Sequence, residues 1–361
     1  MPRLRSILIL LLPFALANCG GGNSQHDSEK KARGTPWPTI STAEAGLNES
    51  ALQTFAQAVG GNGVLIRYDK LAFTWGQPDK ALDVASASKP VMAHFVFKAI
   101  EAGKIASLDE PVAKWLPELG HLNPALHHKD ANITWRHLLN QTSCYGVTEA
   151  PGTAYDYNDF QTALLWTLIY EKVSNVPREE ITAQVLGPQL FDLIGAQDKP
   201  KLRLQPEPKV NGRLVISPRD FARLGLVYLH GGKWNGQPII DAAHVGTAIG
   251  SPLPLTLPRT QGKDADMLPH QRSYGGGKNQ EDHLGCYTFM WWLNRDKELW
   301  PSLPADTFAA IGNGGPKTLM VIPSLDLVLA WNDANMKPLP LYAGGREQME
   351  AVLVKLMDAV R

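Results

Sequence analysis

Cysteine is scarce in this chain, and several other absences limit what the protein can be. Its 361 residues include 3 cysteines, too few for a fold held together by disulfides. Cys144 and Cys286 lie far apart, and two distant cysteines in a protein with a large core are more often separate than paired, although a disulfide between them stays open. The formal net charge is +0, with no block of like charges in the body of the chain, so no basic face for nucleic acid is expected.

Two common kinds of catalytic site are also missing. No G-x-S-x-G elbow occurs in the sequence, which argues against an α/β-hydrolase. The pair His127-His128 has no acidic or cysteine ligands beside it in the sequence, so a solvated turn is expected there rather than a metal site. We therefore expect neither a metal nor another cofactor.

The N-terminal segment has the pattern of an export signal. Two arginines precede an apolar run over 7–12 that is too short to span a bilayer, and Leu16-Ala17-Asn18-Cys19 follows. These four residues are similar to the bacterial lipobox, although Asn18 departs from its usual small residue. We expect residues 1–19 to be a lipoprotein-type signal peptide with Cys19 lipidated, and the alternative is an ordinary signal peptide. Either predicts export, with a lipid anchor placing the protein in the periplasm or on the outer membrane of a bacterium.

The rest of the chain divides into a polar linker and one large domain. Residues 20–36 are polar and rich in glycine, serine and lysine, which is typical of a flexible tether. Residues 37–361 suffice for one domain with an insertion. The elements expected in it are a hairpin over 63–75, a helix over 86–102, a mainly helical subdomain over about 105–245, a long loop over 251–282, strands at 286–294, 307–311, 319–322 and 325–331, and a helix over 345–361. The sheet must then be built from both ends of the chain, an α+β layout.

Ser86 and Lys89 form the most informative pair in the sequence. Residues three apart on a helix share a face, so a helical turn starting at Ser86 would aim the Lys89 amine at the Ser86 hydroxyl. A desolvated lysine can lose its proton and activate a serine, and the Ser86 N–H could stabilise an oxyanion. Ser28 and Lys31 have the same spacing in a polar stretch, so spacing alone proves little. The apolar residues after Lys89 favour a buried, functional turn over a simple N-cap.

Three later segments extend this pattern. The first is Pro151-Gly152-Thr153-Ala154-Tyr155-Asp156-Tyr157-Asn158-Asp159, which precedes an apolar helix; the second is Ile133-Thr134-Trp135-Arg136-His137-Leu138-Leu139-Asn140-Gln141-Thr142-Ser143; and the third spans 211–236 and includes Ser217-Pro218-Arg219-Asp220. Together with Ser86 and Lys89, their order resembles the β-lactamase-related serine hydrolases, a family that includes class C β-lactamases, D-Ala-D-Ala carboxypeptidases, family VIII esterases and 6-aminohexanoate-oligomer hydrolases. The resemblance implies a penicillin-binding-protein-like antiparallel sheet flanked by helices.

The resemblance also assigns roles to residues. Ser86 matches the family nucleophile, Lys89 its partner base, and Tyr157 the tyrosine that shuttles a proton to the leaving group. Tyr155 competes for that last role two residues earlier, and a merely packed tyrosine is the structural alternative.

Two departures from the family pattern bear on activity. Asp159 replaces the family asparagine after Tyr157, and a carboxylate can accept a hydrogen bond from Lys89 but cannot donate one to substrate. In the family's third motif, a late strand that precedes Asn313-Gly314-Gly315 here, the lactamase-type Lys-Thr-Gly is absent, and Pro316 has no N–H to offer. The resemblance then points to Asn313, together with Ser86, as the backbone donors of an oxyanion hole.

The missing cation decides between substrate classes within the family. β-Lactams and D-Ala-D-Ala peptides carry a carboxylate that such a cation would bind. We therefore expect a serine hydrolase that cleaves a small ester or amide through an acyl-enzyme on Ser86. The alternatives are a β-lactamase or carboxypeptidase with a cation supplied from elsewhere, with Arg219, Lys278 and Lys317 as candidates, or a catalytically weak binding protein of the cell envelope.

Overall fold

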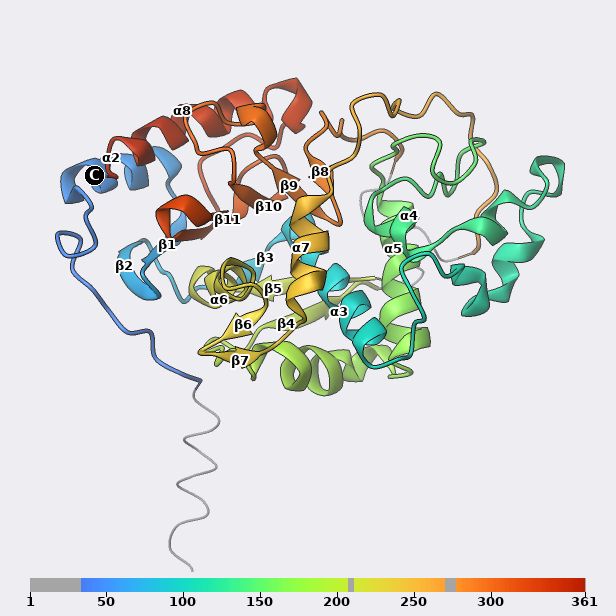
Figure 1. Cartoon of the computed structure of the whole chain (residues 1–361), viewed down its shortest axis with the longest axis horizontal. Coiled ribbons are helices and arrows are strands. Elements are labelled where there is room, and N and C mark those ends of the chain that lie inside the picture. The colour runs from blue at the N-terminus through green and yellow to red at the C-terminus, as the bar shows by residue number, and fades with distance from the viewer. Residues whose placement is uncertain (1–33, 207–210, 270–276, 361) are drawn as a thin grey trace, which may run out of the picture. The chain divides into compact units, whose positions relative to one another are not determined.

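A seven-stranded antiparallel sheet organises the fold in the computed structural model, which describes residues 34–206, 211–269 and 277–360 (Figure 1). In spatial order its strands are β2 (Lys70–Trp75), β1 (Asn62–Arg67), β12 (Leu327–Asn332), β11 (Lys317–Ile322), β10 (Phe308–Gly312), β9 (Trp291–Leu293) and β8 (Tyr287–Thr288). Strand β1 pairs with β12, with Leu65 opposite Leu329. The sheet therefore joins both ends of the domain, which confirms the predicted α+β fold.

Helices cover both faces of this sheet. The Trp331 ring of β12 contacts Phe55 of α2 (Glu49–Val59), with ring centroids 6.4 Å apart. Val328 of the same strand faces α6 (Pro218–Leu229), since a Cβ added at Gly225 would lie 2.6 Å from its side chain. Residues three apart on a strand point to opposite faces, so α2 and α6 lie on opposite faces. Helix α8 (Gly345–Met357) packs beside α2 (Figure 1), and strands β1 and β12 are buried throughout, as expected for a sheet covered on both faces.

The middle of the chain is less purely helical than predicted. Between 105 and 245 the regular helices are α4 (Trp135–Leu139), α5 (Asp159–Trp166), α6 and the start of α7 (Ala242–Gly250), with π-helical segments at Thr167–Val173 and Thr182–Phe191. The same range holds β4 (Lys201–Leu204) and β5 (Gly212–Ile216), which form a small sheet with β3 (Leu82–Asp83), and the hairpin of β6 (Lys233–Trp234) and β7 (Gln237–Pro238). Helix α6 packs on the large sheet rather than within a separate helical unit.

Two other predicted elements differ in detail. The helix expected from Ser86 begins as a 3-10 turn, η1 (Ala85–Ser88), and becomes α-helical only in α3 (Lys89–Glu101). The strand expected over 286–294 is split into β8 and β9 by a tight turn at Phe289 and Met290, both with positive φ. Apolar side chains on both sides of this turn are buried, so hydropathy alone did not reveal the break.

The N-terminal predictions fall mostly outside the described residues. Residues 1–33, which include the predicted signal peptide and Cys19, are among those not described. The end of the predicted tether is bound to the domain, because the Thr35 N–H donates to the Gly195 carbonyl at 2.9 Å. Within the described ranges, no helix is both long and apolar enough to cross a membrane. Cys144 and Cys286 are both buried and free. The disulfide between them, which the sequence left undecided, is therefore not formed in the structure.

Candidate active site

Ser86 and Lys89 are brought together by the geometry of η1. The Lys89 N–H donates to the Ser86 carbonyl, and in such a 3-10 turn the side chains of residues i and i+3 eclipse. The Lys89 Nζ consequently lies 2.9 Å from the Ser86 Oγ. Lys89 is only 3% exposed, as predicted from the apolar residues around it. The turn is fixed at its start by Asp83, whose Oδ1 accepts the Ala85 N–H at 2.8 Å.

The end of strand β10 lies directly against this turn. A Cβ added at Gly312 would lie 2.4 Å from the Val84 carbonyl oxygen, so only glycine permits this approach. Asn313 follows with a φ of 55° and lines the same cleft as Ser86. The structure therefore brings the two predicted backbone donors, Ser86 and Asn313, to one cavity.

Tyr157, and not Tyr155, reaches this cavity. Tyr157 lines the cleft with Ser86, and the Lys89 Nζ lies 4.7 Å from the centre of its ring. Tyr155 is fully buried and packs edge-on against His283 and Tyr287. Of the two tyrosines, the one matched to the family motif, Tyr157, is therefore the one that lines the cleft.

A buried polar network holds the segment that carries Tyr157. The Asp156 carboxylate accepts from the Asn158 side-chain amide and from the Asn279 N–H, both at 2.7 Å. Asn158 also caps helix α5 by accepting the Gln161 N–H at 2.8 Å. Burial raises the pKa of the Asp156 carboxyl. These bonds hold both neighbours of Tyr157 in place, and the Tyr157 ring itself packs against the rings of Tyr287 and Trp292.

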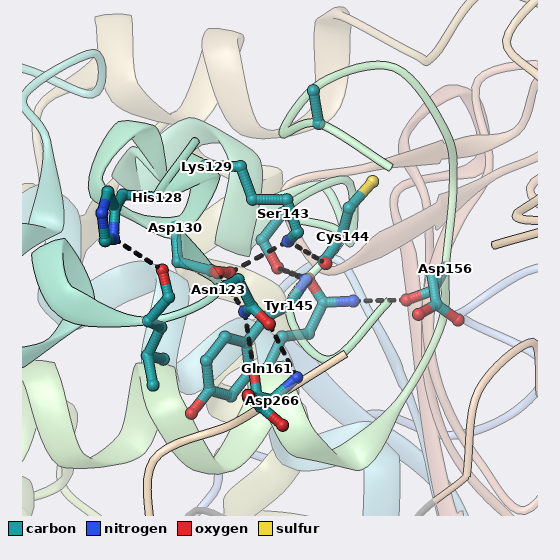
Figure 2. A network of polar contacts seen from close by, with 12 residues as sticks. Asn123, His128, Lys129, Asp130, Ser143, Cys144, Tyr145, Asp156, Gln161 and Asp266 are labelled. Carbon is teal, nitrogen blue, oxygen red and sulfur yellow. Dashed lines mark hydrogen bonds and ion pairs between the residues drawn. The ribbon is translucent and has the colours of Figure 1, made fainter. Parts of the chain in front are cut away.

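The same network continues away from the cleft (Figure 2). The Gln161 side-chain amide donates to the Asp156 carbonyl, and the Ser143 hydroxyl donates to the Gln161 Oε1 at 2.7 Å. Farther on, Lys129 donates to Asp130 at 3.0 Å and to the Cys144 carbonyl at 2.9 Å. Burial raises the pKa of the Cys144 thiol to about 11. Cys144 is therefore a packed neutral thiol and not a nucleophile.

Asp159 lies close to Lys89 but on a different cavity from Tyr157. Its Oδ1 is 4.0 Å from the Lys89 Nζ, which agrees with the predicted charge pairing. Asp159 lines a small cavity of about 40 Å³ that also touches Ser86 and Lys89, whereas it is not among the residues that line the main cleft. Asp159, which the sequence predicted at the substrate or in the shell around the site, thus lies beside Lys89 and lines the smaller cavity.

The main cleft has a volume of about 450 Å³ and is lined by few charged groups. Its described lining residues include no lysine or arginine; they are Ser86, Tyr157, Asn279, Gln280, Glu281, Trp292, Ile311, Asn313, Gly314, Pro338, Leu339, Pro340, Leu341 and Tyr342. A cation that could bind a substrate carboxylate was predicted to be missing from the third family motif alone; it is missing from all the described residues that line this cavity.

The three alternative cations are placed elsewhere. Arg219 donates to Asp198 and Lys278 to Asp264, the latter at 2.8 Å. Lys317 lies opposite Gly312 on the neighbouring strand, and burial lowers the pKa of its amine. None of the three lines the described cleft.

Glu281 is a charged residue of the cleft that was not predicted from the sequence. Its Oε2 accepts the Leu341 N–H at 2.8 Å, and burial raises the pKa of its carboxyl to about 7. Glu281 belongs to the aperiodic segment predicted only as a long loop, which in its described parts has neither helix nor strand. No motif or periodicity in that segment pointed to the cleft.

Across the described ranges, no three histidine, cysteine, aspartate or glutamate side chains are grouped so that they could hold a metal ion. The chemistry available at the cleft is that of a serine hydroxyl, a buried amine, a tyrosine and backbone donors.

Comparison with known proteins identifies the family. The sequence profile described as Beta-lactamase matches residues 49–332, and none of the curated proteins compared with the chain matches it. Among solved structures, the fold is similar to that of a protein assigned as a 6-aminohexanoate-dimer hydrolase from Bacillus anthracis (TM-score 0.63, 13% identity, covering 90% of this chain and 88% of that one).

Two further structures share this fold. A β-lactamase from Mycobacterium bovis has a TM-score of 0.56 at 18% identity, covering 85% of this chain and 99% of that one. A penicillin-binding protein homologue from Caulobacter crescentus has a TM-score of 0.57 at 13% identity, covering 89% and 99%. Since the family profile spans most of the chain, including the Ser86 turn and Asn313, this protein belongs to the beta-lactamase family, whose members are serine hydrolases.

Proposed function

We propose that this protein hydrolyses a small ester or amide through a covalent acyl-enzyme on Ser86. The observation that carries the proposal is the 2.9 Å contact between the Lys89 Nζ and the Ser86 Oγ, made by a lysine that is 3% exposed. At this distance the Lys89 amine is placed to accept the Ser86 proton. The cleft beside this pair gives a substrate access to the hydroxyl.

The reaction follows from these positions. Lys89 takes the hydroxyl proton while the Ser86 Oγ attacks the acyl carbon, and the tetrahedral oxyanion is stabilised by the N–H groups of Ser86 and Asn313. The proton then passes to the leaving group, with the Tyr157 hydroxyl as the shuttle that the family resemblance implies. Water attacks the acyl-enzyme in the second half and restores Ser86. The cation–ring contact between Lys89 and Tyr157 supports their action as a unit.

The charge of the cleft supports an ester or amide over a β-lactam or a D-Ala-D-Ala peptide. Both of the latter bring a carboxylate, and the described lining of the cleft offers Glu281 but no lysine or arginine to receive it. An unpaired carboxylate in a partly buried site loses binding free energy. We expect a difference of roughly a hundredfold or more in kcat/KM, equivalent to a few kcal/mol.

The test compares three substrates on one preparation: a short-chain p-nitrophenyl ester, a linear amide and a chromogenic cephalosporin. We expect the ester or the amide to be preferred, Ser86→Ala to abolish turnover, and Ser88→Ala to retain it, since the Ser88 hydroxyl donates instead to the Ala85 carbonyl at 2.7 Å. Preference for the cephalosporin would contradict the substrate class. Binding without turnover of any of the three would favour the catalytically weak binding protein, for which the Asp159–Lys89 pair is the structural argument.

We also propose that the protein is exported and anchored to a bacterial membrane through lipid on Cys19. The support is the arginine-led apolar run and the four residues 16–19. The hydrolase would then act in the periplasm or at the outer membrane, on small molecules that reach the cell envelope.

A further inference from the structure

The described residues that line the substrate cleft carry charge of one sign only. Glu281 is the single acidic side chain among them, and they include no lysine or arginine. Lys89 belongs to the catalytic group and is almost fully buried. A ligand in the cleft therefore meets the Glu281 carboxyl, and none of the described lining residues is a cation that competes for it.

Three aromatic rings in the cleft also favour binding of a cation. Tyr157, Trp292 and Tyr342 line the cleft, and aromatic faces attract cations. The protein's own cations already use two of them: Lys89 lies 4.7 Å from the centre of the Tyr157 ring, and Arg259 lies 4.3 Å from that of Tyr342. A carboxyl group among such rings is a typical environment for binding an ammonium group.

Glu281 retains capacity to bind a ligand. Its carboxylate accepts backbone hydrogen bonds from Leu341, at Oε2, and from Tyr342, and a carboxylate has about four acceptor positions in all. Two cations near it, Arg259 and Lys89, favour the ionised form of the Glu281 carboxyl. The other titratable groups around it are the phenols of Tyr155 and Tyr287 and the carboxyl of Asp282, the next residue in the chain. Burial raises the pKa of both phenols well above the ordinary tyrosine value, so they stay neutral.

We propose that the cleft selects esters or amides that carry an ammonium group, and that the Glu281 carboxylate receives this group. The inference rests on the proposed function and deepens it by naming the substrate class. Glu281 acts here as a specificity residue, because it contacts a remote part of the substrate and takes no part in the acyl transfer.

The preference for an ammonium-bearing substrate should depend on pH. Burial raises the pKa of Glu281 to about 7, so the carboxyl is ionised above that pH and protonated below it, while a quaternary ammonium group keeps its charge throughout. The preference for the cationic substrate should therefore appear as the pH rises through about 7 and fade below it. Because the catalytic groups act on both substrates alike, their own titration cancels in a ratio.

The experiment uses two esters of the same shape that differ in charge: butyrylcholine and 3,3-dimethylbutyl butyrate. At pH 8 we expect a kcat/KM ratio of at least about tenfold in favour of the cation, a conservative share of what an ion pair in a partly buried site can supply. The ratio should fall at pH 6. A second pair, with the ammonium group on the acyl side, covers the opposite orientation of the substrate.

Two variants test whether Glu281 binds the ammonium group or only supports the fold. Glu281→Gln should bring the ratio close to one and remove its pH dependence, whereas Glu118→Gln, an exposed carboxylate outside the described cleft, should leave the ratio as in the parent protein. If Glu281 only held the Leu341 segment in place, Glu281→Gln would lower both rates together and leave the ratio unchanged, which would overturn the proposal.

The remaining outcomes distinguish this inference from the proposed function. Hydrolysis of the neutral ester with a ratio near one in both pairs would overturn the ammonium preference and leave the hydrolase assignment standing. If neither ester is cleaved, the proposed function fails, and calorimetric titration of both esters into the Ser86→Ala protein decides the preference by itself. Equal affinities in that titration would overturn it.

Discussion

At the scale of single residues, the position of Lys89 is explained by the local geometry of η1. An α-helical turn would have offset the two side chains, whereas the 3-10 turn eclipses positions i and i+3 and brings the Lys89 Nζ to 2.9 Å from the Ser86 Oγ. Ala85, with a φ of 50°, is in a conformation that costs energy for a residue with a side chain. Strain of this kind is common at functional sites.

Replacing Tyr157 tests the proposed proton shuttle. Tyr157→Phe keeps the ring over Lys89 and removes only the hydroxyl, so we expect turnover of a short-chain ester to fall by about a hundredfold, the usual effect of losing a general acid or base. Tyr155→Phe is the matched control: the Tyr155 hydroxyl is buried without a hydrogen-bond partner among the described residues, and its loss should leave turnover near that of the parent protein. Steady-state kinetics on both variants give the answer, and the opposite order of effects would show that Tyr155 is the shuttle.

At the scale of elements, the contact between β10 and η1 brings Ser86 and Asn313, the two proposed oxyanion donors, to one cavity. A Cβ at position 312 would lie 2.4 Å from the Val84 carbonyl, so Gly312→Ala must push the strand away from the turn. We expect a loss of about 1–3 kcal/mol in unfolding free energy, together with lower turnover, because Asn313 moves with the strand.

The control for this substitution lies in α7. A Cβ at Gly246 would meet nothing within 4 Å, and replacing glycine by alanine inside a helix is stabilising by up to about 1 kcal/mol. Thermal unfolding and ester hydrolysis are measured on both variants. If Gly312→Ala behaves like Gly246→Ala, close approach of β10 to η1 does not limit the site.

The buried pair of Lys129 and Asp130 (Figure 2) should be a main support of the inserted segment. Removing one partner of a buried ion pair leaves an uncompensated charge, so Lys129→Met should destabilise the protein by about 3–5 kcal/mol, and adding Asp130→Asn should recover much of the loss. Lys114→Met is the control, because Lys114 and Glu110 have the same 3.0 Å separation but the lysine is 57% exposed, and such pairs contribute at most about 1 kcal/mol. Urea unfolding measures all three, and equal effects of the two lysine substitutions would contradict the account.

The sequence was sufficient to predict the elements whose patterns are local. The hairpin of β1 and β2 and the late strands β10 to β12 follow from short apolar runs between turn residues. The π-helical segments at 167–173 and 182–191 could not be predicted, because helical periodicity does not distinguish them from an α-helix. Nor could the break at Phe289 and Met290, since buried residues flank it on both sides.

At the scale of the whole molecule, the site is assembled from distant parts of the chain. Ser86 and Lys89 come from the first third, Tyr157 from the insertion, and Asn313 and Leu341 from the C-terminal part. Ordered motifs were enough to predict the first four of these. The wall formed by Glu281 and Leu341 was not predictable, because their hydrogen bond joins an irregular segment to a short 3-10 turn 60 positions away.

The predicted lipid anchor is tested on the intact protein in cells. Cys19→Ala removes the thiol that would carry lipid, so we expect the protein to move from the membrane fraction to the soluble fraction of the cell envelope. Fractionation and N-terminal mass spectrometry of the parent protein and the variant measure this. Recovery of the parent protein without detergent, with a mature N-terminus other than Cys19, would contradict the prediction.

The central claim is that Ser86 forms the covalent intermediate, and mapping a covalent adduct tests it most directly. The purified protein is treated with a fluorophosphonate and digested, and the modified peptide is sequenced by mass spectrometry. We predict a single adduct on Ser86, formed in the Ser88→Ala protein and lost in Ser86→Ala. Labelling that persists unchanged in Ser86→Ala, or an adduct mapped to another residue, would contradict it.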